Sequence, residues 1–499
     1  MELKFQKRSL KLFRRAAGEV QNQEQTLEVR LSDGMPDIGR VLASWGQMIL
    51  RGKEWRTGSI SFSGGVQVWT LYAPEDGSDV RCVESWLPFQ MHWNMPQEER
   101  DGDIRVQCLL RFVDARSVSA RKLMLRAGIA ALGEAYVPDE TDVAVPEEVP
   151  EDVQLLKATY PVRLYKEAGE KAFDLDEDLT LPGSSPAPSK LIYCTMQPEI
   201  TEKRVSGNRV AFRGNGNLHL LYRSEEGQLH GWDFELPFSM LGDLKDTYGS
   251  DAQAEIAMAV TDLELVLEGE GHFRLKCGLL GQYLVSDRQM IEIVEDAYST
   301  RRHLEPEREM LELPTILDSR METMNAEQSI QQDADILVDT AFLPDFPRQR
   351  RNADSVELEL PGQFQALWYG EDGRLQAGTA RWEGSRKLNA DEDTTVQTQV
   401  IPMGRPQAMS GNGNFTMRAD TGLQVTTQSQ GGIPMVTGLE LEGEREAAAN
   451  RPSLILRRTG TDRLWDIAKS TGSTVEAIRQ ANGLEDAPKP EQILLIPVS

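Results

Sequence analysis

The sequence contains few of the side chains on which most enzymes and metal proteins depend. Its 499 residues include five histidines and four cysteines, and none of them falls in an HExxH, HxH or CxxC arrangement. The GK[ST] phosphate loop and the GxSxG nucleophile elbow are also missing. These absences favour a protein that is not an enzyme, and we predict no catalytic residues, no metal site and no cofactor.

The sequence also lacks long apolar runs. A membrane span needs about 18 apolar residues in succession and a secretory signal about 7–15, and neither length occurs in the chain. The four cysteines are widely separated, at Cys82, Cys108, Cys194 and Cys277, which is typical of buried thiols in a reducing compartment. We therefore expect a cytoplasmic protein.

The N-terminal segment Met1–Val20 is basic. It interleaves six lysines and arginines with five leucines and phenylalanines. We expect a solvated helix that precedes the first domain. The alternative is an amphipathic helix resting on an acidic membrane or partner, so any membrane contact would be peripheral.

Basic residues are scarce in the chain as a whole. There are 54 of them against 79 acidic residues, which gives a net charge of −25. Such a surface repels phosphate backbones, so we exclude nucleic acid as a partner. Apolar residues make up 39% of the chain, which is enough for packed cores, and 499 residues are too many for a single core. The composition predicts a globular protein of several domains.

Three segments of the chain resemble one another. Each alternates apolar and polar residues, reaches a tyrosine, turns at acidic residues followed by glycine, and then resumes. The tyrosines Tyr72, Tyr222 and Tyr369 lie 150 and 147 residues apart, and Leu-Pro-Phe follows the first two turns, at 87–89 and 236–238. The near-constant spacing predicts three repeats.

Alternation at a period of two predicts β-hairpins with one buried face in each repeat. Further short strands follow in the second repeat, and Gly411–Gly413 marks a comparable turn in the third. The predicted fold class is therefore mainly β with α: three β-rich, sandwich-like repeats followed by a small domain with the order strand, helix, helix, strand.

Domain boundaries are expected near residues 150, 310 and 450. The N-terminal helix and first repeat would occupy 1–150, a linker and the second repeat 151–310, the third, divergent repeat 311–450, and the small domain 451–499. Two further segments are typical of loops. Asp139–Pro150 is acidic and contains proline, and Pro182–Ser189 is rich in proline, glycine and serine.

The C-terminal residues carry the most specific local pattern. A strand from Leu454 leads to a first helix, and Asp462 is placed to cap that helix. Ser473 and Thr474 precede a second helix, which stops at Asn482-Gly483. A last strand ends at Ile496-Pro497. The apolar residues of the two helices predict a small but complete core.

This pattern resembles the LysM domain, whose Leu-Trp-x-Ile-Ala, Asn and Ile-Pro signatures stand here at 464–468, 482 and 496–497. Trp465 could be a wedge in the core or an exposed anchor for a partner, and the resemblance favours the anchor. What the resemblance implies is a set of partner-binding residues: Asp462, Leu464, Trp465, Ile467, Ile478 and Asn482.

The sequence departs from the LysM pattern at two places. The family's Gly-Asp-Thr turn is Thr461-Asp462-Arg463 here, and its Pro-Gly is Pro490-Glu491. In wall-binding members these positions border the groove for N-acetylglucosamine sugars. The departures favour a protein partner over a sugar.

The preceding ~450 residues resemble the SPOCS-type domains of spore-coat assembly proteins, through the two Leu-Pro-Phe motifs and the segment Glu295–Thr300. The resemblance implies a cytoplasmic protein of the mother cell that assembles on the forespore surface as part of the spore coat. It also implies that the LysM domain engages the coat-basement ATPase, stage IV sporulation protein A, alongside other coat proteins.

Two other functions are left open by the sequence. A LysM domain can bind peptidoglycan, so a glycan-binding protein of the cell wall or spore cortex is the competing hypothesis. A glycan hydrolase is the third, because a carboxylate pair such as Asp76 and Glu84 could act on a glycan. With 79 acidic residues in the chain, such pairs are inevitable.

Overall fold

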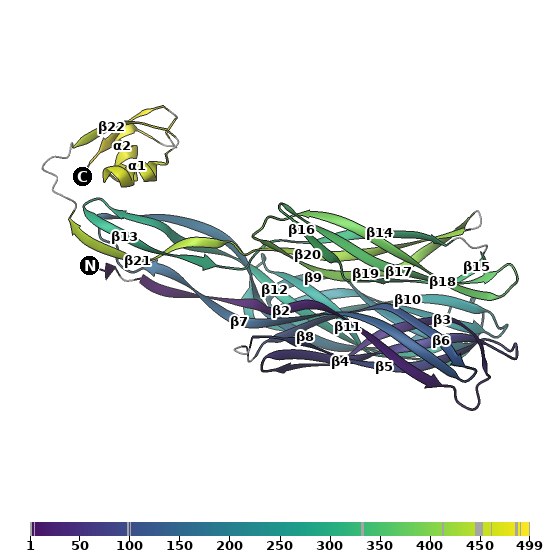
Figure 1. Ribbon diagram of the computed structural model, residues 1–499. Helices are drawn as coiled ribbons and strands as arrows, with labels where there is room; N and C mark the ends of the chain where they lie inside the picture. Colours follow the sequence, from purple (N-terminus) through teal and green to yellow (C-terminus); the bar gives the residue numbers. More distant parts are fainter. Residues whose placement is uncertain are drawn as a thin grey trace.

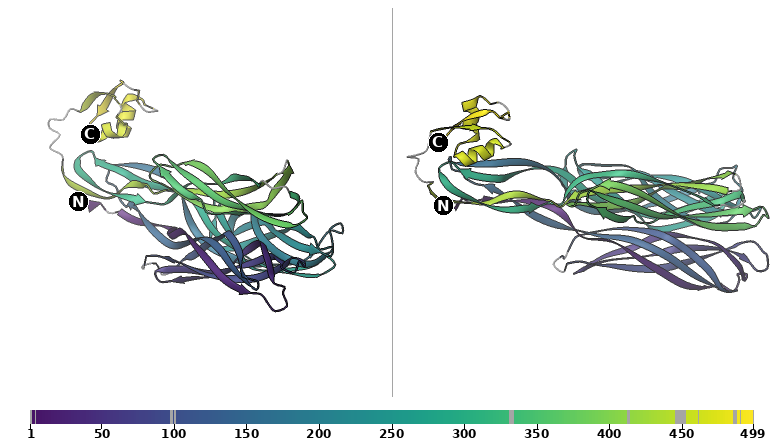
Figure 2. Two further views of the ribbon diagram at one scale, coloured as in Figure 1. Left: turned by 45° about the vertical axis from the view of Figure 1, so that its right-hand side comes forward. Right: turned by 45° about the horizontal axis from the view of Figure 1, so that its top comes forward.

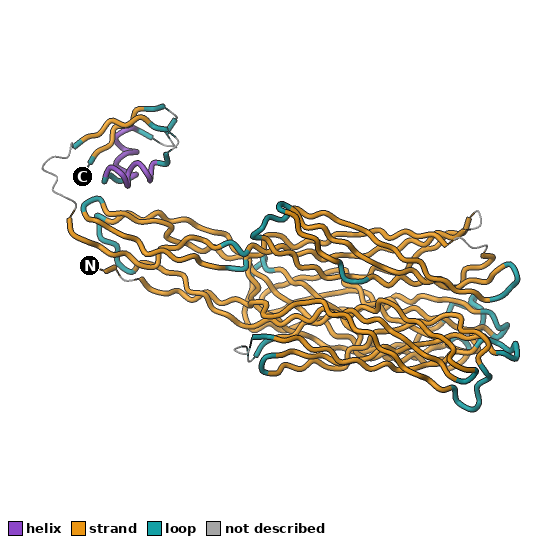
Figure 3. Tube along the Cα trace, viewed as in Figure 1, coloured by secondary structure: helices purple, strands orange, loops and turns teal. Residues whose placement is uncertain are grey.

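The computed structural model describes residues 2–3, 5–96, 99, 101–330, 334–411, 414–444, 453–460, 462–484, 488–489 and 491–498. Within these ranges, nearly all regular structure is antiparallel strand, and the two helices lie near the C-terminus, as the predicted fold class requires (Figures 1 and 3). None of the helices in the described part of the chain has the length and apolar character needed to cross a membrane.

The first group of strands forms a sandwich of two three-stranded sheets. Its strands are β2 (Phe5–Arg30), β3 (Ile38–Arg56), β4 (Ser59–Pro74), β5 (Arg81–Asn94), β6 (Asp103–Ser119) and β7 (Lys122–Pro146). One sheet has the order β3-β4-β5 and the other β2-β7-β6. The first and last strands of the group therefore pair with each other.

The second group repeats this arrangement. It consists of β8 (Val153–Thr180), β9 (Pro188–Ser224), β10 (Leu229–Tyr248), β11 (Gln253–Gly269) and β12 (His272–Ser299). Its sheets are β11-β12-β8 and β10-β9. Strand β9 corresponds to β3 and β4 together: the Ser189 hydroxyl donates to the Arg223 carbonyl and the Thr201 hydroxyl to that of Arg213, so the two halves of β9 lie side by side. The turn between them is at Gly207, whose φ is 60°.

The third group follows the same strand order, except that its first and last strands are each interrupted and form two shorter strands. Its strands are β13 (Arg302–Glu312), β14 (Thr315–Ile330), β15 (Ala334–Pro344), β16 (Arg348–Asn352), β17 (Ser355–Gly370), β18 (Leu375–Asn389), β19 (Thr394–Gly411), β20 (Asn414–Ser429) and β21 (Gly432–Glu444). One sheet joins β15 and β16 to β17 and β18, and the second is β14-β20-β19. The third sheet of this group has the order β1-β21-β13, and its strand β1 (Glu2–Leu3) comes from the N-terminus.

The repeated tyrosines mark equivalent places in the three groups. Tyr72, Tyr222 and Tyr369 stand near the ends of β4, β9 and β17, just before the hairpin turn in each group. Each turn contains a glycine with positive φ, at Gly77, Gly227 and Gly373. The acidic-Gly pattern therefore predicted the hairpins correctly, because glycine adopts this backbone conformation without a steric penalty.

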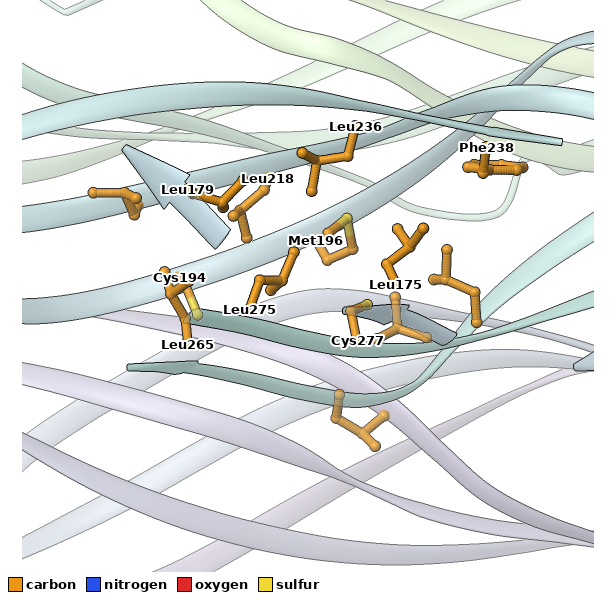
Figure 4. Packing of buried hydrophobic residues seen from close by; sticks show 14 of the residues in the cluster. Leu175, Leu179, Cys194, Met196, Leu218, Leu236, Phe238, Leu265, Leu275 and Cys277 are labelled. Carbon is orange, nitrogen blue, oxygen red and sulfur yellow. The ribbon is translucent and has the colours of Figure 1, made fainter. Parts of the chain in front are cut away.

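The three sandwiches lie together as a broad head, and the outer parts of β2, β7, β8, β12, β13 and β21 extend from it as a narrower arm (Figures 1 and 2). Apolar side chains from all three groups fill the arm, including Leu12, Leu164 and Met435. In the head, the largest cluster of buried side chains centres on the second group (Figure 4). Cys194 and Cys277 are buried in this cluster as predicted, whereas Cys82 and Cys108 are only partly buried.

Two local predictions fail together. Phe5–Val20 belongs to strand β2 and not to a helix, and most of the expected loop Asp139–Pro150 belongs to β7, which runs to Pro146. The basic strand pairs with the acidic one: Lys7 Nζ lies 3.4 Å from an Asp142 oxygen, and Arg14 Nε lies 2.8 Å from one of Asp139. Opposite charges on neighbouring strands stabilise the pairing. The two segments lie ~130 residues apart, so neither shows locally that the other is its partner.

Other expected breaks fall inside the strand groups. Residues 181–187 form a turn between β8 and β9, so the loop predicted at Pro182–Ser189 is largely confirmed and lies within the second strand group. The boundary expected near 310 falls within β13. Of the turn expected at Gly411–Gly413, Asn412 and Gly413 lie outside the described residues.

A buried carboxylate joins all three groups of strands. Glu255 on β11 accepts hydrogen bonds from Arg105 on β6 at 3.3 Å, Tyr165 on β8 at 3.1 Å, and Ser319 on β14 and Thr426 on β20 at 3.2 and 2.7 Å. Its side chain is 12% exposed and that of Arg105 is 9% exposed. Because a buried charge without partners is costly, these contacts fix how the sandwiches meet.

Candidate functional site

The C-terminal residues form the small domain that the sequence predicts. It consists of β22 (Leu454–Arg458), α1 (Leu464–Thr471), α2 (Val475–Asn482) and β23 (Ile493–Pro497), with β22 and β23 paired antiparallel. The Thr474 hydroxyl accepts a hydrogen bond from the Ala477 amide at 3.0 Å and caps α2. Gly472 and Gly483, with φ of 69° and 59°, end the two helices in the left-handed conformation.

Three of the predicted site residues make up the core of this domain. Leu464 is 8% exposed, and Ile467 and Ile478 are fully buried, together with Leu494 and Ile496 of β23. The helices pack on one face of the two-stranded sheet through these side chains. Their burial holds the domain together and leaves them no direct contact with a partner.

Asn482 has a structural role in this domain. Its amide nitrogen donates to the carbonyl oxygens of Ile478 at 2.7 Å and Leu495 at 2.6 Å, and its amide oxygen accepts from the Leu495 amide at 2.8 Å. The side chain therefore ties the end of α2 to the middle of β23. Its hydrogen-bonding groups are used within the domain.

Asp462 does not cap α1, in contrast to the prediction. The residue before the helix is Arg463, and no side chain accepts a hydrogen bond from the first turn. The Asp462 carboxylate instead accepts a 2.7 Å hydrogen bond from Arg457 of β22. The attraction of this neighbouring guanidinium turns the carboxylate toward the strand.

Trp465 is buried by another part of the same chain. It is 8% exposed, and its ring meets that of Tyr298 on β12 edge to face, with centroids 4.8 Å apart. Its indole Nε1 donates to Asp296 Oδ2 at 2.8 Å. The prediction of an exposed tryptophan is therefore wrong, since α1 docks on the arm through this side chain.

Two further residues of the small domain complete this contact. Lys469 Nζ lies 2.8 and 2.7 Å from the two oxygens of Asp296, and the Tyr298 hydroxyl donates to the Ser473 carbonyl at 2.8 Å. Burial alone would raise the pKa of Asp296, but the hydrogen bonds from Lys469 and Trp465 outweigh it and lower that pKa. Burial raises the pKa of Tyr298 to about 12, so its hydroxyl remains a donor.

Sequence reasoning missed Lys469 and Ser473, because each looks like an ordinary solvated helix-end residue. Asp296 and Tyr298 belong to the segment Glu295–Thr300, which carried a family resemblance but no expected contact with the small domain. The available signal for this contact was chemical complementarity: Trp465 and Lys469 on the helix can pair with the carboxylate of Asp296 and the ring of Tyr298.

The two loops that border the expected sugar groove are tied to each other. The Thr459 hydroxyl donates to the Lys489 carbonyl at 2.7 Å, and the Glu491 amide donates to the Thr459 carbonyl at 3.0 Å. Thr461 and Pro490, where the sequence departs from the LysM pattern, lie outside the described residues.

Comparisons with known families match two parts of the chain. A model described as SipL, SPOCS domain matches residues 189–268, which cover all of β10 and almost all of β9 and β11, and a LysM domain model matches 462–497. Neither a curated protein nor a solved structure matches the chain.

Proposed function

From the premise that this chain carries a SPOCS domain and a LysM domain, which mark a sporulation-related protein with a domain of the peptidoglycan-binding type, we propose that it is a structural scaffold of the spore coat. It acts in the mother-cell cytoplasm and assembles on the forespore surface. Its LysM domain docks a protein partner, the coat-basement ATPase of the stage IV sporulation protein A type. The observation that carries the proposal is the presence of both domains in one chain.

The construction of the head and arm supports a scaffold. Buried ionisable groups of different strand groups satisfy one another: Glu255 joins three groups, and Asp339 on β15 is bonded to Tyr193 and Arg405. Such pairs hold large elements in fixed positions. We propose that the three strand groups are three domains that display faces to other coat proteins, and that they carry out no catalysis.

The docked position of the LysM domain supports a protein partner. Because Trp465 and Lys469 contact Asp296, the domain is held on the arm as part of a larger surface. Asp462, beside the expected sugar groove, is engaged by Arg457.

The second candidate function is binding of peptidoglycan in the cell wall or spore cortex. The observation that favours it is the LysM match itself, which includes the Leu464–Ala468 signature and Asn482. Under this alternative the chain would meet glycan through the loops between β22 and α1 and between α2 and β23.

A pair of capture experiments tests the proposal. The full chain and a truncated chain of residues 1–450 are immobilised separately and incubated with lysate of sporulating cells. We expect the full chain to recover the coat ATPase and the truncated chain to lose it. In parallel, both chains are sedimented with purified peptidoglycan. If the full chain sediments with the glycan and captures no ATPase, the glycan-binding function replaces the proposal.

A further inference from the structure

The outer face of the LysM sheet is aliphatic. Leu454 and Leu456 of β22 are 50% and 68% exposed, and Ile493 and Leu495 of β23 are 58% and 37% exposed. In the register of the two strands, Leu456 lies opposite Leu495, Leu454 opposite Pro497 and Ile493 opposite Arg458. These four large side chains form one continuous surface, which we call the aliphatic face.

Strict alternation along the two strands creates this face. Ile455, Leu494 and Ile496 point the other way, toward the helices, and the latter two are fully buried. A strand places successive side chains on opposite sides of its sheet. Both sides of this sheet are thus apolar, although only one side has a layer packed on it.

Exposed apolar side chains are concentrated here. Of the sixteen large hydrophobic residues that are exposed in the described part of the chain, four lie on the ten residues of β22 and β23. Together they expose a few hundred Å², about the size of the largest apolar patch on a typical monomeric protein, and such patches are often functional.

The contact with the arm leaves the aliphatic face uncovered. That contact uses Trp465, Lys469 and Ser473 of the helical layer. The helices lie between the sheet and the arm, and the sheet is on the outer side (Figures 1 and 2). Docking on β12 therefore turns the aliphatic face away from the rest of the molecule.

The dimensions of the face fit a helix. Two strands about 4.8 Å apart and five residues long give a surface of roughly 10 by 17 Å. A helix is about 10–12 Å wide with its side chains, and about 11 residues span 17 Å. An amphipathic helix of three turns, with apolar residues at i, i+3, i+4 and i+7, would cover the four side chains.

Area and charge both disfavour a second copy of this chain. A stable interface buries about 800 Å² on each partner, and the aliphatic face offers about half of that or less. Residues 451–499 hold seven basic and six acidic side chains, whereas residues 1–450 hold 47 basic and 73 acidic ones. Two such acidic bodies repel each other, while a less acidic partner can approach the nearly neutral LysM domain.

We propose that the aliphatic face of β22 and β23 is the surface on which the protein partner docks, and that the partner contributes the apolar stripe of an amphipathic helix. This inference rests on the proposed function and names the surface that carries it out. The groove between the loops is not the contact surface, and Trp465 acts indirectly by orienting the domain.

The test measures binding of the purified coat ATPase to the full-length chain by biolayer interferometry. The variants are Leu454→Glu and Leu456→Glu on the aliphatic face. The matched control is Leu241→Glu on β10, since Leu241 and Leu454 are both 50% exposed. All four positions of the face are solvent-exposed, so folding is retained, and far-UV circular dichroism verifies this for each variant.

We expect the two face variants to bind at least tenfold more weakly and the control to bind like the wild type. If the wild type binds the ATPase and the face variants bind equally well, the aliphatic face is not the docking surface and the proposed function survives. If the wild type fails to bind, the proposed function and the inference both fail. If sedimentation velocity shows a wild-type dimer that Leu456→Glu converts to a monomer, the occupant is a second copy and the inference is wrong.

Discussion

Replacing Asp296 with alanine should release the LysM domain from the arm. The carboxylate is 17% exposed and accepts hydrogen bonds from Trp465 and Lys469. A hydrogen bond to a charged group contributes about 1.5–3 kcal/mol. The Lys469 side chain is 37% exposed, so solvent screening limits its ion pair to about 0–1 kcal/mol. A loss of about 2–3 kcal/mol lowers the docking equilibrium constant roughly 30- to 150-fold.

Distances between two spin labels measure the docking directly. Labels at Gln480→Cys on α2 and Glu309→Cys on β13 are both at exposed positions. Burial raises the pKa of Cys82, Cys108 and Cys277 to about 12, so these native thiols react slowly at neutral pH. We expect one narrow distance distribution in the wild type and a broad one in Asp296→Ala.

Asp178→Ala is the control, because Asp178 also accepts a hydrogen bond from a cation, Arg274, but is 75% exposed and does not contact the LysM domain. It should leave the distribution narrow. The same narrow distribution in Asp296→Ala would refute the reasoning, because the carboxylate would then not be what holds the domain.

The docking should also depend on pH. The docking contacts with Lys469 and Trp465 lower the pKa of Asp296, and a hydrogen bond from Arg308 of β13, which does not depend on docking, lowers it as well. The stabilisation from docking is therefore complete above the ordinary aspartate pKa of about 3.9 and is lost as the pH falls through the lowered value. The wild-type distribution should broaden below about pH 4, and that of Asp296→Ala should not change in this window. Circular dichroism at each pH verifies that the sheets persist.

Three further substitutions test the fold. Asn482→Ala removes the three hydrogen bonds that tie α2 to β23 and should destabilise the LysM domain by about 1–3 kcal/mol in denaturant titrations, while Gln480→Ala should change its stability little. Glu255→Ala breaks the junction of the three strand groups and should cost about 3–5 kcal/mol. Glu24→Ala, in an exposed pair with Arg126, is the control and should change the stability little, because solvent screens this pair. Gly214→Ala would place a Cβ in steric overlap with the Glu199 carbonyl oxygen, so we expect at least about 1–3 kcal/mol of strain and a lower melting temperature.

Local patterns were sufficient for much of the fold. The hairpins that turn at Gly77, Gly227 and Gly373 could be predicted from the alternation of apolar and polar residues and from glycine's freedom to adopt a positive φ. The LysM domain was also predictable, since its two helices and two strands are close in sequence and its core can be read from a single helical face.

Predictions failed where the partner of a segment is distant in sequence. Phe5–Val20 has apolar and basic residues in a spacing that fits either a helix or a strand, and only the acidic strand β7 decides between them. Trp465 was predicted to be exposed because the sequence of the LysM domain contains nothing that would bury it. Asp296 and Tyr298, which bury it, lie more than 160 residues upstream.

The pairing of β1 with β21 sets an order for folding during translation. Glu2 and Leu3 pair with Glu440 and Leu439, so the edge of the arm is completed only after Leu439 and Glu440 have left the ribosome. The first two sandwiches likewise close their last strand on their first, about 90 or more residues earlier in synthesis. The nascent chain therefore carries open strand edges for most of its synthesis, a period in which contacts with neighbouring nascent chains favour misassembly.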